Sequence, residues 1–321
     1  MKAAYRDRYG GIDVLEIKEV DKLSPKNNEV LIKVFATTVN RTDCANLTAK
    51  PFIMRFVLGL FKPKKKIIGT DFVGEVIAKG NEATKFEIGD KVMGFFDTGI
   101  QSQAEFIVIK EDIPFKIPHN IHHKRAIASM EGGHYAYTFI KKTNLQPGQS
   151  VFINGATGAI GSALIQFVNT FDVKITATCN TKNIELIKSL GADKIFDYTK
   201  EDFTKLETEK YDYIFDAVGK STFGECKHLL KKKGVYISSE LGPYSQNIFY
   251  PLLTLLTNKK VVFPVPYSTK ESLPYIINKL KNEQFKPVID TEYAFESISK
   301  AYAYVMSGNK TGNVVININK V

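Results

Sequence analysis

The chain has 321 residues, a hydrophobic fraction of 44% and a formal net charge of +10, which excludes a disordered or fibrous protein and allows two folded domains. Its lysines are spread along the sequence, mostly beside acids, except at "KPKKK" (62–66) and "KKK" (231–233), which argues against a nucleic-acid partner. No stretch reaches about 20 apolar residues and the N-terminus has no signal-peptide core, so we expect a cytoplasmic protein without an integral membrane segment.

Residues 1 to about 120 show a β-rich pattern. Short apolar or alternating runs such as "LEIKEV", "EVLIKVFATTV", "GEVIAKG", "DKVMGF" and "AEFIVIK" are separated by Gly, Asp, Asn and Pro, and no long helical period interrupts them. Within this region, "PFIMRFVLGLF" (51–61) places Phe52, Phe56 and Leu60 at helical spacing. We expect a helix that packs on a core or borders a substrate cleft, and the alternative is a short helix on a membrane surface.

From about residue 121, strand and helix patterns alternate. Strands are predicted at "SVFIN", "KITATC", "KIFDY", "YDYIFDAV" and "GVYISS", with helices between them, which is typical of a doubly wound parallel sheet. The last fifty or so residues return to a mixed pattern. We therefore predict an α/β protein with a β-rich substrate domain over 1–122, a dinucleotide-binding domain over 123–266, and a return to the first domain over 267–321.

A glycine-rich turn, "NGATGAIGSALIQF" (154–167), joins the strand "SVFI" to a helix pattern. A turn of this kind presents backbone N–H groups at the positive end of the helix dipole, where a pyrophosphate can bind. Gly158 leaves room for that approach, Gly161 allows close packing of helix on strand, and Ala156 takes the first position of the G-x-G-x-x-G fingerprint. Close packing alone could also explain the glycines, but the strand–turn–helix–strand context favours a dinucleotide site.

The strand after this helix indicates which dinucleotide binds. An NAD site commonly has an acid at the end of that strand, but no acid occurs between Asp172 and Glu185. The turn "CNTKN" instead offers Asn180, Thr181 and Lys182 to a 2′-phosphate, although Asn180 or Thr181 could equally cap the next helix. We predict NADPH as the cofactor.

Several motifs together resemble those of a zinc-independent medium-chain dehydrogenase/reductase of the quinone oxidoreductase type. They include "NEVLIKVFATTVNRTD", "IIGTDFVGEVIAKG", "FEIGDKVMGF", "LQPGQSVFINGATGAIGSALIQ" and "SGNKTGNVVI", and "TATCNTKNIELIKSLGADKIFDY" is similar to the branch of the chloroplast-envelope homologue. The resemblance covers nearly the whole chain. It implies a GroES-like catalytic domain built from both termini, a central Rossmann domain, and a cofactor between them.

The stretches that correspond to the zinc ligands of related alcohol dehydrogenases lack those ligands. Asn40 stands where the Cys would be, and Thr70 and Asp71 replace His and Glu. The chain has only three cysteines, too few for a structural zinc lobe, and the histidine cluster "HNIHHK" opens a helix. We therefore predict no metal.

Without a Lewis acid, a conjugated acceptor is easier to reduce than an isolated ketone. We predict an NADPH-dependent reductase of small hydrophobic quinones or enones. The alternatives are an NADPH-binding regulatory or structural protein with little turnover, and a zinc-independent alcohol or ketone oxidoreductase. The resemblance implies catalytic positions at Asn40, Asp43 and Tyr135, although Asn40 could simply cap a turn and Tyr135 could belong to the core.

The remaining predictions concern cofactor contacts and assembly. The apolar run Val261–Phe263, followed by Pro264 and Pro266, predicts an edge strand and a homodimer, unless the prolines block such pairing. The predicted cofactor contacts are Gly155, Ala156, Thr157, Gly158, Ala159, Ile160, Gly161, Cys179, Asn180, Thr181, Lys182, Asn183, Tyr198, Val218, Gly219, Gly312 and Asn313.

Overall fold

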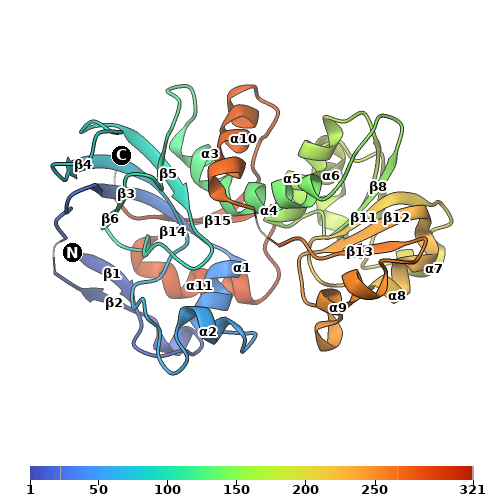
Figure 1. The fold of residues 1–321 in the computed structure, drawn as a ribbon, viewed down its shortest axis with the longest axis horizontal. Helices are drawn as coiled ribbons and strands as arrows, with labels where there is room; N and C mark the ends of the chain where they lie inside the picture. Colours follow the sequence, from blue (N-terminus) through green and yellow to red (C-terminus); the bar gives the residue numbers. More distant parts are fainter. Residues whose placement is uncertain (22, 266, 320–321) are drawn as a thin grey trace. The chain divides into compact units, whose positions relative to one another are not determined.

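A computed structural model of the chain describes residues 1–21, 23–265 and 267–319 (Figure 1). The chain divides into two compact units. Unit 1 contains residues Met1–Glu131 and Val288–Val321, so both termini belong to it, and unit 2 contains Gly132–Pro287. The prediction places the return to the first domain at residue 267, whereas the structure places it at residue 288.

Unit 1 is built on a seven-stranded sheet with the order β14-β15-β3-β4-β5-β7, in which β6 also pairs with β3. All its pairs are antiparallel except β14 with β15, and β1 and β2 form a separate hairpin. The strands are β1 (Lys2–Tyr5), β2 (Glu16–Glu19), β3 (Glu29–Val39), β4 (Asp71–Lys79), β5 (Lys91–Phe95), β6 (Phe106–Lys110), β7 (Phe115–Lys116), β14 (Ile289–Ala294) and β15 (Asn313–Asn317). The helices are α1 (Arg41–Thr48), α2 (Met54–Leu58), α3 (His123–Ala128) and α11 (Ile298–Met306).

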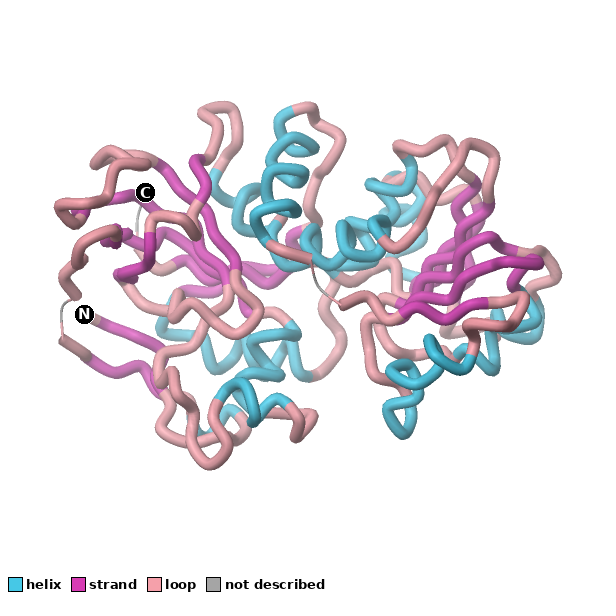
Figure 2. The backbone as a smooth tube through the Cα atoms, in the orientation of Figure 1, coloured by secondary structure: helices cyan, strands magenta, loops and turns pink. Residues whose placement is uncertain are grey.

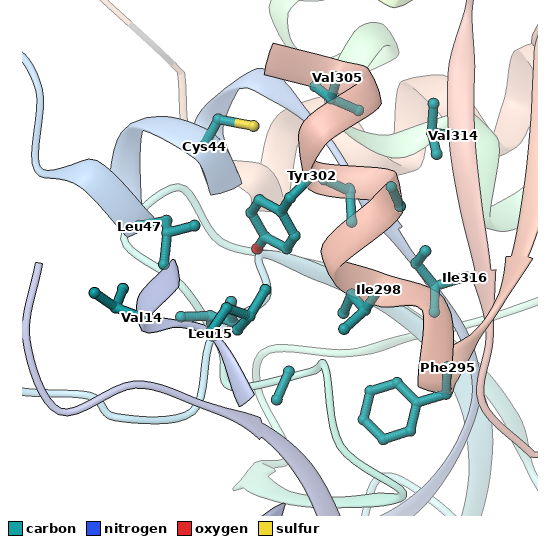
Figure 3. Close-up of a cluster of buried hydrophobic side chains, with 14 residues drawn as sticks. Val14, Leu15, Cys44, Leu47, Phe295, Ile298, Tyr302, Val305, Val314 and Ile316 are labelled. Atoms are coloured by element: carbon teal, nitrogen blue, oxygen red, sulfur yellow. The ribbon is translucent and has the colours of Figure 1, made fainter. Parts of the chain in front are cut away.

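One core of unit 1 lies where α11 packs against α1 and the sheet (Figure 3). Tyr302 and Val305 on α11 meet Cys44 and Leu47 on α1, and all four side chains are buried. The hydroxyl group of Tyr302 donates to Gln103 Oε1 at 3.0 Å, which satisfies the only polar atom of that side chain. A segment near the C-terminus thus fixes the helix that follows β3.

Unit 2 contains a six-stranded sheet with the order β10-β9-β8-β11-β12-β13, in which every pair is parallel. The strands are β8 (Ser150–Asn154), β9 (Lys174–Cys179), β10 (Lys194–Asp197), β11 (Tyr211–Asp216), β12 (Leu230–Ser238) and β13 (Lys260–Val262). The helices are α4 (Met130–Lys141), which begins in unit 1, α5 (Ala159–Asn169), α6 (Ile184–Ser189), α7 (Phe203–Leu206), α8 (Phe223–Cys226), α9 (Gln246–Leu253) and α10 (Thr269–Lys281). In Figures 1 and 2, helices α5 and α6 lie on one side of the strands and α7, α8 and α9 on the other. The predicted doubly wound sheet is confirmed.

Helix α10 explains why the second unit extends beyond residue 267. Its residues Leu273, Ile276 and Leu280 are fully buried. Ile276 lies against Gly133 of α4, and the ring of Tyr275 meets the ring of Phe167 of α5 at a centroid distance of 5.3 Å. Burial of this apolar face therefore ties α10 to unit 2.

The segment 51–61 is not packed on a core, and the other part of the prediction, that it borders a substrate cleft, stays a prediction. Helix α2 covers only Met54–Leu58, because Gly59 adopts a φ of +124° that ends it. Leu58 is the only buried residue of this helix, whereas Phe56 is 66% exposed and Phe61 is 84% exposed. Helical spacing alone could not show which face is covered.

Two further predictions concern the membrane and the edge of the sheet. No helix among the described residues is long and apolar enough to cross a membrane. Strand β13 lies at the edge of the sheet of unit 2, as predicted, but it ends at Val262, so Phe263 and Pro264 follow the strand. Pro266, and with it the predicted boundary at 266, lies outside the described residues.

Candidate functional site

The predicted cofactor residues of unit 2 follow the carboxyl ends of neighbouring parallel strands. Strand β8 ends at Asn154 beside Asp216 of β11, and β9 ends at Cys179 beside Asp197 of β10. Because parallel strands end at one edge of the sheet, the segments 155–161, 179–183, 198 and 218–219 meet at that edge. Ligands of open α/β sheets bind at this position.

The glycine turn after β8 is held rigidly by its neighbours. The N–H of Gly155 donates to Thr178 Oγ1 at 2.9 Å, and the N–H of Ala156 donates to the Thr178 carbonyl at 3.1 Å. A Cβ on Gly161 would lie 2.2 Å from the Gly155 carbonyl oxygen, so only glycine allows helix α5 to pack this closely on the turn. A Cβ on Gly158 would meet nothing nearer than 3.8 Å, which leaves space beside the start of α5.

The start of α5 has the features of an anion site. Gly158 is its N-cap residue, no side chain caps the helix, and no acid lies in its first turn. The first-turn N–H groups of a helix have no intrahelical acceptor and lie at the positive end of the helix dipole. A pyrophosphate would satisfy both conditions.

The loop after β11 adjoins the same turn. Gly155 has a φ of +81°, and a Cβ on it would lie 2.6 Å from the side chain of Val218. Asp216 orders this loop, because its Oδ1 accepts from the N–H groups of Val218 at 3.3 Å and Gly219 at 3.0 Å. Burial raises the pKa of Asp216, and hydrogen bonds from the Val218 and Ser221 N–H groups and from the Tyr236 hydroxyl counteract the shift. Asp216 is thus a positioning residue that sequence reasoning missed.

The turn after β9 lies beside an acidic residue, Asp197 of β10, which is distant from it in the sequence. Asp197 lies in register with Cys179, and its Oδ2 accepts from the hydroxyl of Thr181 at 2.5 Å. This hydrogen bond and a second one, from the hydroxyl of Thr199, lower the pKa of Asp197 to about 2. The pairing of β9 with β10 is the signal that could have found it, because the ends of paired parallel strands adjoin.

The two asparagines of this turn bond to each other through their side chains. Asn183 Nδ2 donates to Asn180 Oδ1 at 2.7 Å, and neither Asn180 nor Asn183 caps the following helix through its side chain. Lys182 is exposed, and it forms no ion pair with any residue that the structure describes. Tyr198, at the end of β10, is also exposed. Lys182 is therefore a cation of this turn that is exposed and not ion-paired within the described part of the chain.

Tyr135 lies on α4, which passes close to the start of α5. A Cβ on Gly132 would lie 2.6 Å from the carbonyl oxygen of Ala159, so the two helices touch there. Tyr135 follows one turn later and is half-buried, and its ring lies 5.4 Å from the ring of His134.

In unit 1, Asn40 joins the end of β3 to α1. It is the N-cap residue of α1: its Oδ1 accepts from the N–H of Asp43 at 2.8 Å, and Asp43 Oδ2 accepts from the N–H of Asn40 at 3.2 Å. The Asn40 amide donates to Thr70 Oγ1 at 2.8 Å and to Thr38 Oγ1 at 3.1 Å. Both N–H bonds of this carboxamide are thereby used within the protein.

Two carboxyl groups beside Asn40 are fully buried. Burial raises the pKa of Asp43 well above its usual range, and the Asp71 carboxylate raises it further. Burial also raises the pKa of Asp71 to about 6, against hydrogen bonds from Thr38 and Thr37. Asp43 Oδ1 has no hydrogen-bond partner among the residues that the structure describes. Asp43 is thus a carboxyl group that holds its proton to a higher pH than an exposed one.

Gly312 and Asn313 also lie near the end of β3. Strand β15 runs antiparallel to β3 with Val314 opposite Val39, which places Asn313 beside the β3–α1 junction. Gly312 has a φ of +72°, and a Cβ there would lie 2.3 Å from the Val288 carbonyl oxygen. The predicted residues thus form two groups, one in unit 1 with Asn40, Asp43, Gly312 and Asn313, and the other in unit 2.

Within the part of the chain that the structure describes, no three His, Cys, Asp or Glu side chains are grouped so as to hold a metal ion. The residues at the strand ends of unit 2 fit a dinucleotide, because they supply a glycine turn, a helix start without an acid and an exposed lysine.

Comparison with known families gives two matches. Residues 26–147 match the alcohol dehydrogenase GroES-like domain, and residues 190–316 match the zinc-binding dehydrogenase domain. The predicted fold class, a GroES-like domain plus a Rossmann domain, is confirmed by these matches together with the parallel sheet of unit 2.

Individual relatives match over nearly the whole chain. A 2-methylene-furan-3-one reductase of Solanum lycopersicum is 31% identical over 98% of this chain and 79% of its own. A chloroplastic quinone-oxidoreductase homolog of Spinacia oleracea is 29% identical over 96% of this chain and 95% of its own. The solved structure of the quinone oxidoreductase from Coxiella burnetii superposes with a TM-score of 0.89 at 22% identity, covering 99% of each chain, and supports the fold alone.

Proposed function

We propose that this chain, which belongs to the medium-chain dehydrogenase/reductase family of oxidoreductases, is an NADPH-dependent reductase that transfers a hydride to a quinone or an α,β-unsaturated carbonyl without a metal ion. The relatives named above include a quinone-oxidoreductase homolog and a furanone reductase, which are proteins named for conjugated acceptors. The finer assignment is supported by the chemistry of this chain's own residues.

The observation that carries the proposal is the hydrogen bond of 2.8 Å between Asn40 and Thr70. The family resemblance implies Cys and His at these two positions in zinc-dependent members, whereas here an amide and a hydroxyl bond directly to each other. Neither group is a preferred ligand of zinc, whose usual partners are thiolate, imidazole and carboxylate. These two positions therefore supply no zinc ligand, and their polar groups bond to each other.

Side chains that are poor metal ligands suit an acceptor whose negative charge becomes delocalised on reduction. When the nicotinamide cofactor is bound, the chemistry that it supplies is a hydride. The hydride would form a bond to the β-carbon of an enone, the π-electron pair would move to the carbonyl oxygen, and a proton from water would be added at the α-carbon. The negative charge is spread over an enolate, or over a hydroquinone anion for a quinone, and modest hydrogen-bond donors stabilise it.

The proposed roles of the catalytic residues follow from their bonds. Asn40 is a positioning residue, because its amide holds Thr70 and its carbonyl caps α1. Asp43, which keeps its proton to a raised pH, is our candidate hydrogen-bond donor to the enolate oxygen, and the phenol of Tyr135 is the second, while the proton for the α-carbon comes from water. On the cofactor side, the start of α5 would bind the pyrophosphate and Lys182 the 2′-phosphate.

A comparison of acceptors with the purified full-length protein tests this proposal. NADPH oxidation is followed with a benzoquinone, with cyclohexenone and with saturated cyclohexanone as the matched control. We expect turnover of both conjugated acceptors, with a kcat/KM at least about a hundredfold above that of cyclohexanone, because a loss of several kcal/mol of Lewis-acid stabilisation affects only the isolated ketone. NADPH binding without any turnover would instead support a regulatory protein, and equal rates for all three compounds would support a ketone reductase.

A further inference from the structure

A pocket lies within unit 1, and Asn46 of α1 is part of its lining. It has a volume of about 80 Å³, and its lining includes the cationic residues Arg6, Lys64 and Lys65 together with the apolar residues Val57, Ile67 and Ile68. A water molecule occupies about 30 Å³ in the liquid, so the pocket has room for a group larger than water.

The Arg6 guanidinium is poorly satisfied for a buried cation. Arg6 is only 3% exposed, and among the described residues its guanidinium has a single acceptor, the Asn46 carbonyl oxygen. Its Nε has no hydrogen-bond partner at all in the same part of the chain. Burial lowers the pKa of Arg6. Tyr302, Tyr9 and Asp43 offset part of this shift, and the Tyr9 ring centroid lies 5.1 Å from the guanidinium carbon, but no carboxylate among the described residues pairs directly with this buried cation.

The neighbouring lysines also lack anionic partners. Lys65 Nζ donates to the Gly99 carbonyl oxygen at 2.6 Å, and Lys64 Nζ donates to the Val57 carbonyl oxygen at 3.4 Å. Burial lowers the pKa of Lys65. Across residues 1–21, 23–265 and 267–319, no Asp or Glu forms an ion pair with Arg6, Lys64 or Lys65. Three cations thus surround one pocket without an ion-paired carboxylate.

We infer that this pocket binds the carboxylate of a small organic acid, held between the Arg6 guanidinium and the Lys65 ammonium. A guanidinium recognises a planar carboxylate through paired N–H donors, and the ammonium adds a second charge. The apolar side chains of Val57, Ile67 and Ile68 suit a short hydrocarbon tail and disfavour a fully hydrated phosphate. The assignment does not depend on the hydride chemistry, because Asn40, Asp43 and Thr70 are not among the residues that line this pocket.

Isothermal calorimetry on the full-length protein tests the assignment with butanoate, its neutral isostere butanamide and inorganic phosphate. We expect butanoate to bind with a Kd of about 1 mM, at least about tenfold more tightly than the other two, because charge-assisted hydrogen bonds need the anion. Absent butanoate binding, or equal binding of butanamide, would overturn the inference. Tighter binding of phosphate would overturn the choice of carboxylate.

Two variants locate the site. K65Q should weaken butanoate binding at least about tenfold, whereas K62Q, in the same lysine-rich loop but outside the pocket lining, should leave the Kd unchanged. R6Q should abolish butanoate binding. Arg6 is buried and R6Q could fail to fold, in which case the comparison of K65Q with K62Q tests the assignment. Equal Kd values for K65Q and K62Q would contradict the assignment.

Discussion

Lys182 is the residue on which cofactor selectivity depends in this account. Its neighbours Asn180, Thr181 and Asn183 bond to one another or to Asp197, which leaves the lysine as the exposed cation of the turn. We predict that NADPH binds at least about tenfold more tightly than NADH, a difference of roughly 1.4 kcal/mol. The substitution Lys182→Gln should remove this preference by weakening NADPH alone.

Calorimetric titration of both cofactors into the wild type and the variant measures the effect. Lys188→Gln is the matched control, because Lys188 is an exposed lysine on the helix that follows the same turn. Equal affinities of the wild type for NADPH and NADH would show that the turn does not read the 2′-phosphate. In that case Asp197, the acid beside Thr181, would become the candidate partner of a ribose hydroxyl group.

Asp71 should make the free energy of unfolding decrease as the pH rises. Its folded-state pKa of about 6 lies above the ordinary value of 3.8, so the folded state binds more protons than the unfolded state between these values. The stabilising effect of that proton is present at low pH and is lost as the pH rises through about 6. This single group should therefore lower the free energy of unfolding by on the order of 2 kcal/mol between pH 4 and pH 7.

Urea unfolding over this pH range, with the wild type and Asp71→Asn compared, checks the sign. The variant has no proton to lose at this position, so its stability relative to the wild type should increase as the pH rises. Asp43 adds to the same trend, because the substitution removes the Asp71 carboxylate that helps to raise the pKa of Asp43. Parallel pH curves for the two proteins would show that Asp71 does not titrate with a raised pKa.

At the scale of elements, substitutions of the two glycines at the start of α5 should have different effects: one should lower the stability of the fold and the other the affinity for NADPH. Gly161→Ala would force a Cβ to within 2.2 Å of the Gly155 carbonyl oxygen, so we expect a loss of at least about 2 kcal/mol of stability. Gly158→Ala has open space and an ordinary φ of −70°, so the fold should be kept while NADPH affinity falls at least about tenfold. Thermal melts and cofactor titrations measure the two effects, and equal melting temperatures for the variants would contradict the packing argument.

The strand–turn–helix–strand unit around Gly158 could be predicted from the sequence, because its pattern is local and both strands are apolar. Asp197 could not be found in the same way, since its proximity to Thr181 comes from the pairing of β9 with β10. The exposure of Phe56 and Phe61 was also missed, because helical spacing shows a shared face but not whether another element covers it.

The contacts of the Asn40 side chain could also be predicted only in part from the sequence. Its place at a turn after β3 is visible in the sequence, and so is the loss of the zinc ligands. Its bond to Thr70 depends on the pairing of β3 with β4, which brings together residues 30 positions apart. The two readings of Asn40, as a cap or as a site residue, are therefore both compatible with the structure.

For the whole molecule, we predict a homodimer formed at the edge of unit 2. Strand β13 is an edge strand, and the neighbouring α9 segment exposes Phe249, Leu252 and Leu256. An apolar surface of this kind beside an unpaired edge favours pairing with a second copy. Light scattering at micromolar concentration should give the mass of two chains.

A matched pair of variants tests where the dimer forms. Leu252→Lys should yield single chains, whereas Leu206→Lys, an exposed leucine on α7 of the same unit, should leave the dimer intact. A wild-type mass of one chain would show that this edge is protected and stays unpaired.

The central claim is hydride transfer to a conjugated carbon without a metal ion. Chelator-treated protein is supplied with NADPH carrying deuterium at the transferable position of the nicotinamide, together with cyclohexenone, and the product is examined by mass spectrometry and NMR. The account predicts deuterium at the β-carbon of cyclohexanone, with a rate unchanged by chelation. An absence of label at that carbon, or activity that is lost on chelation and restored by zinc, would contradict it.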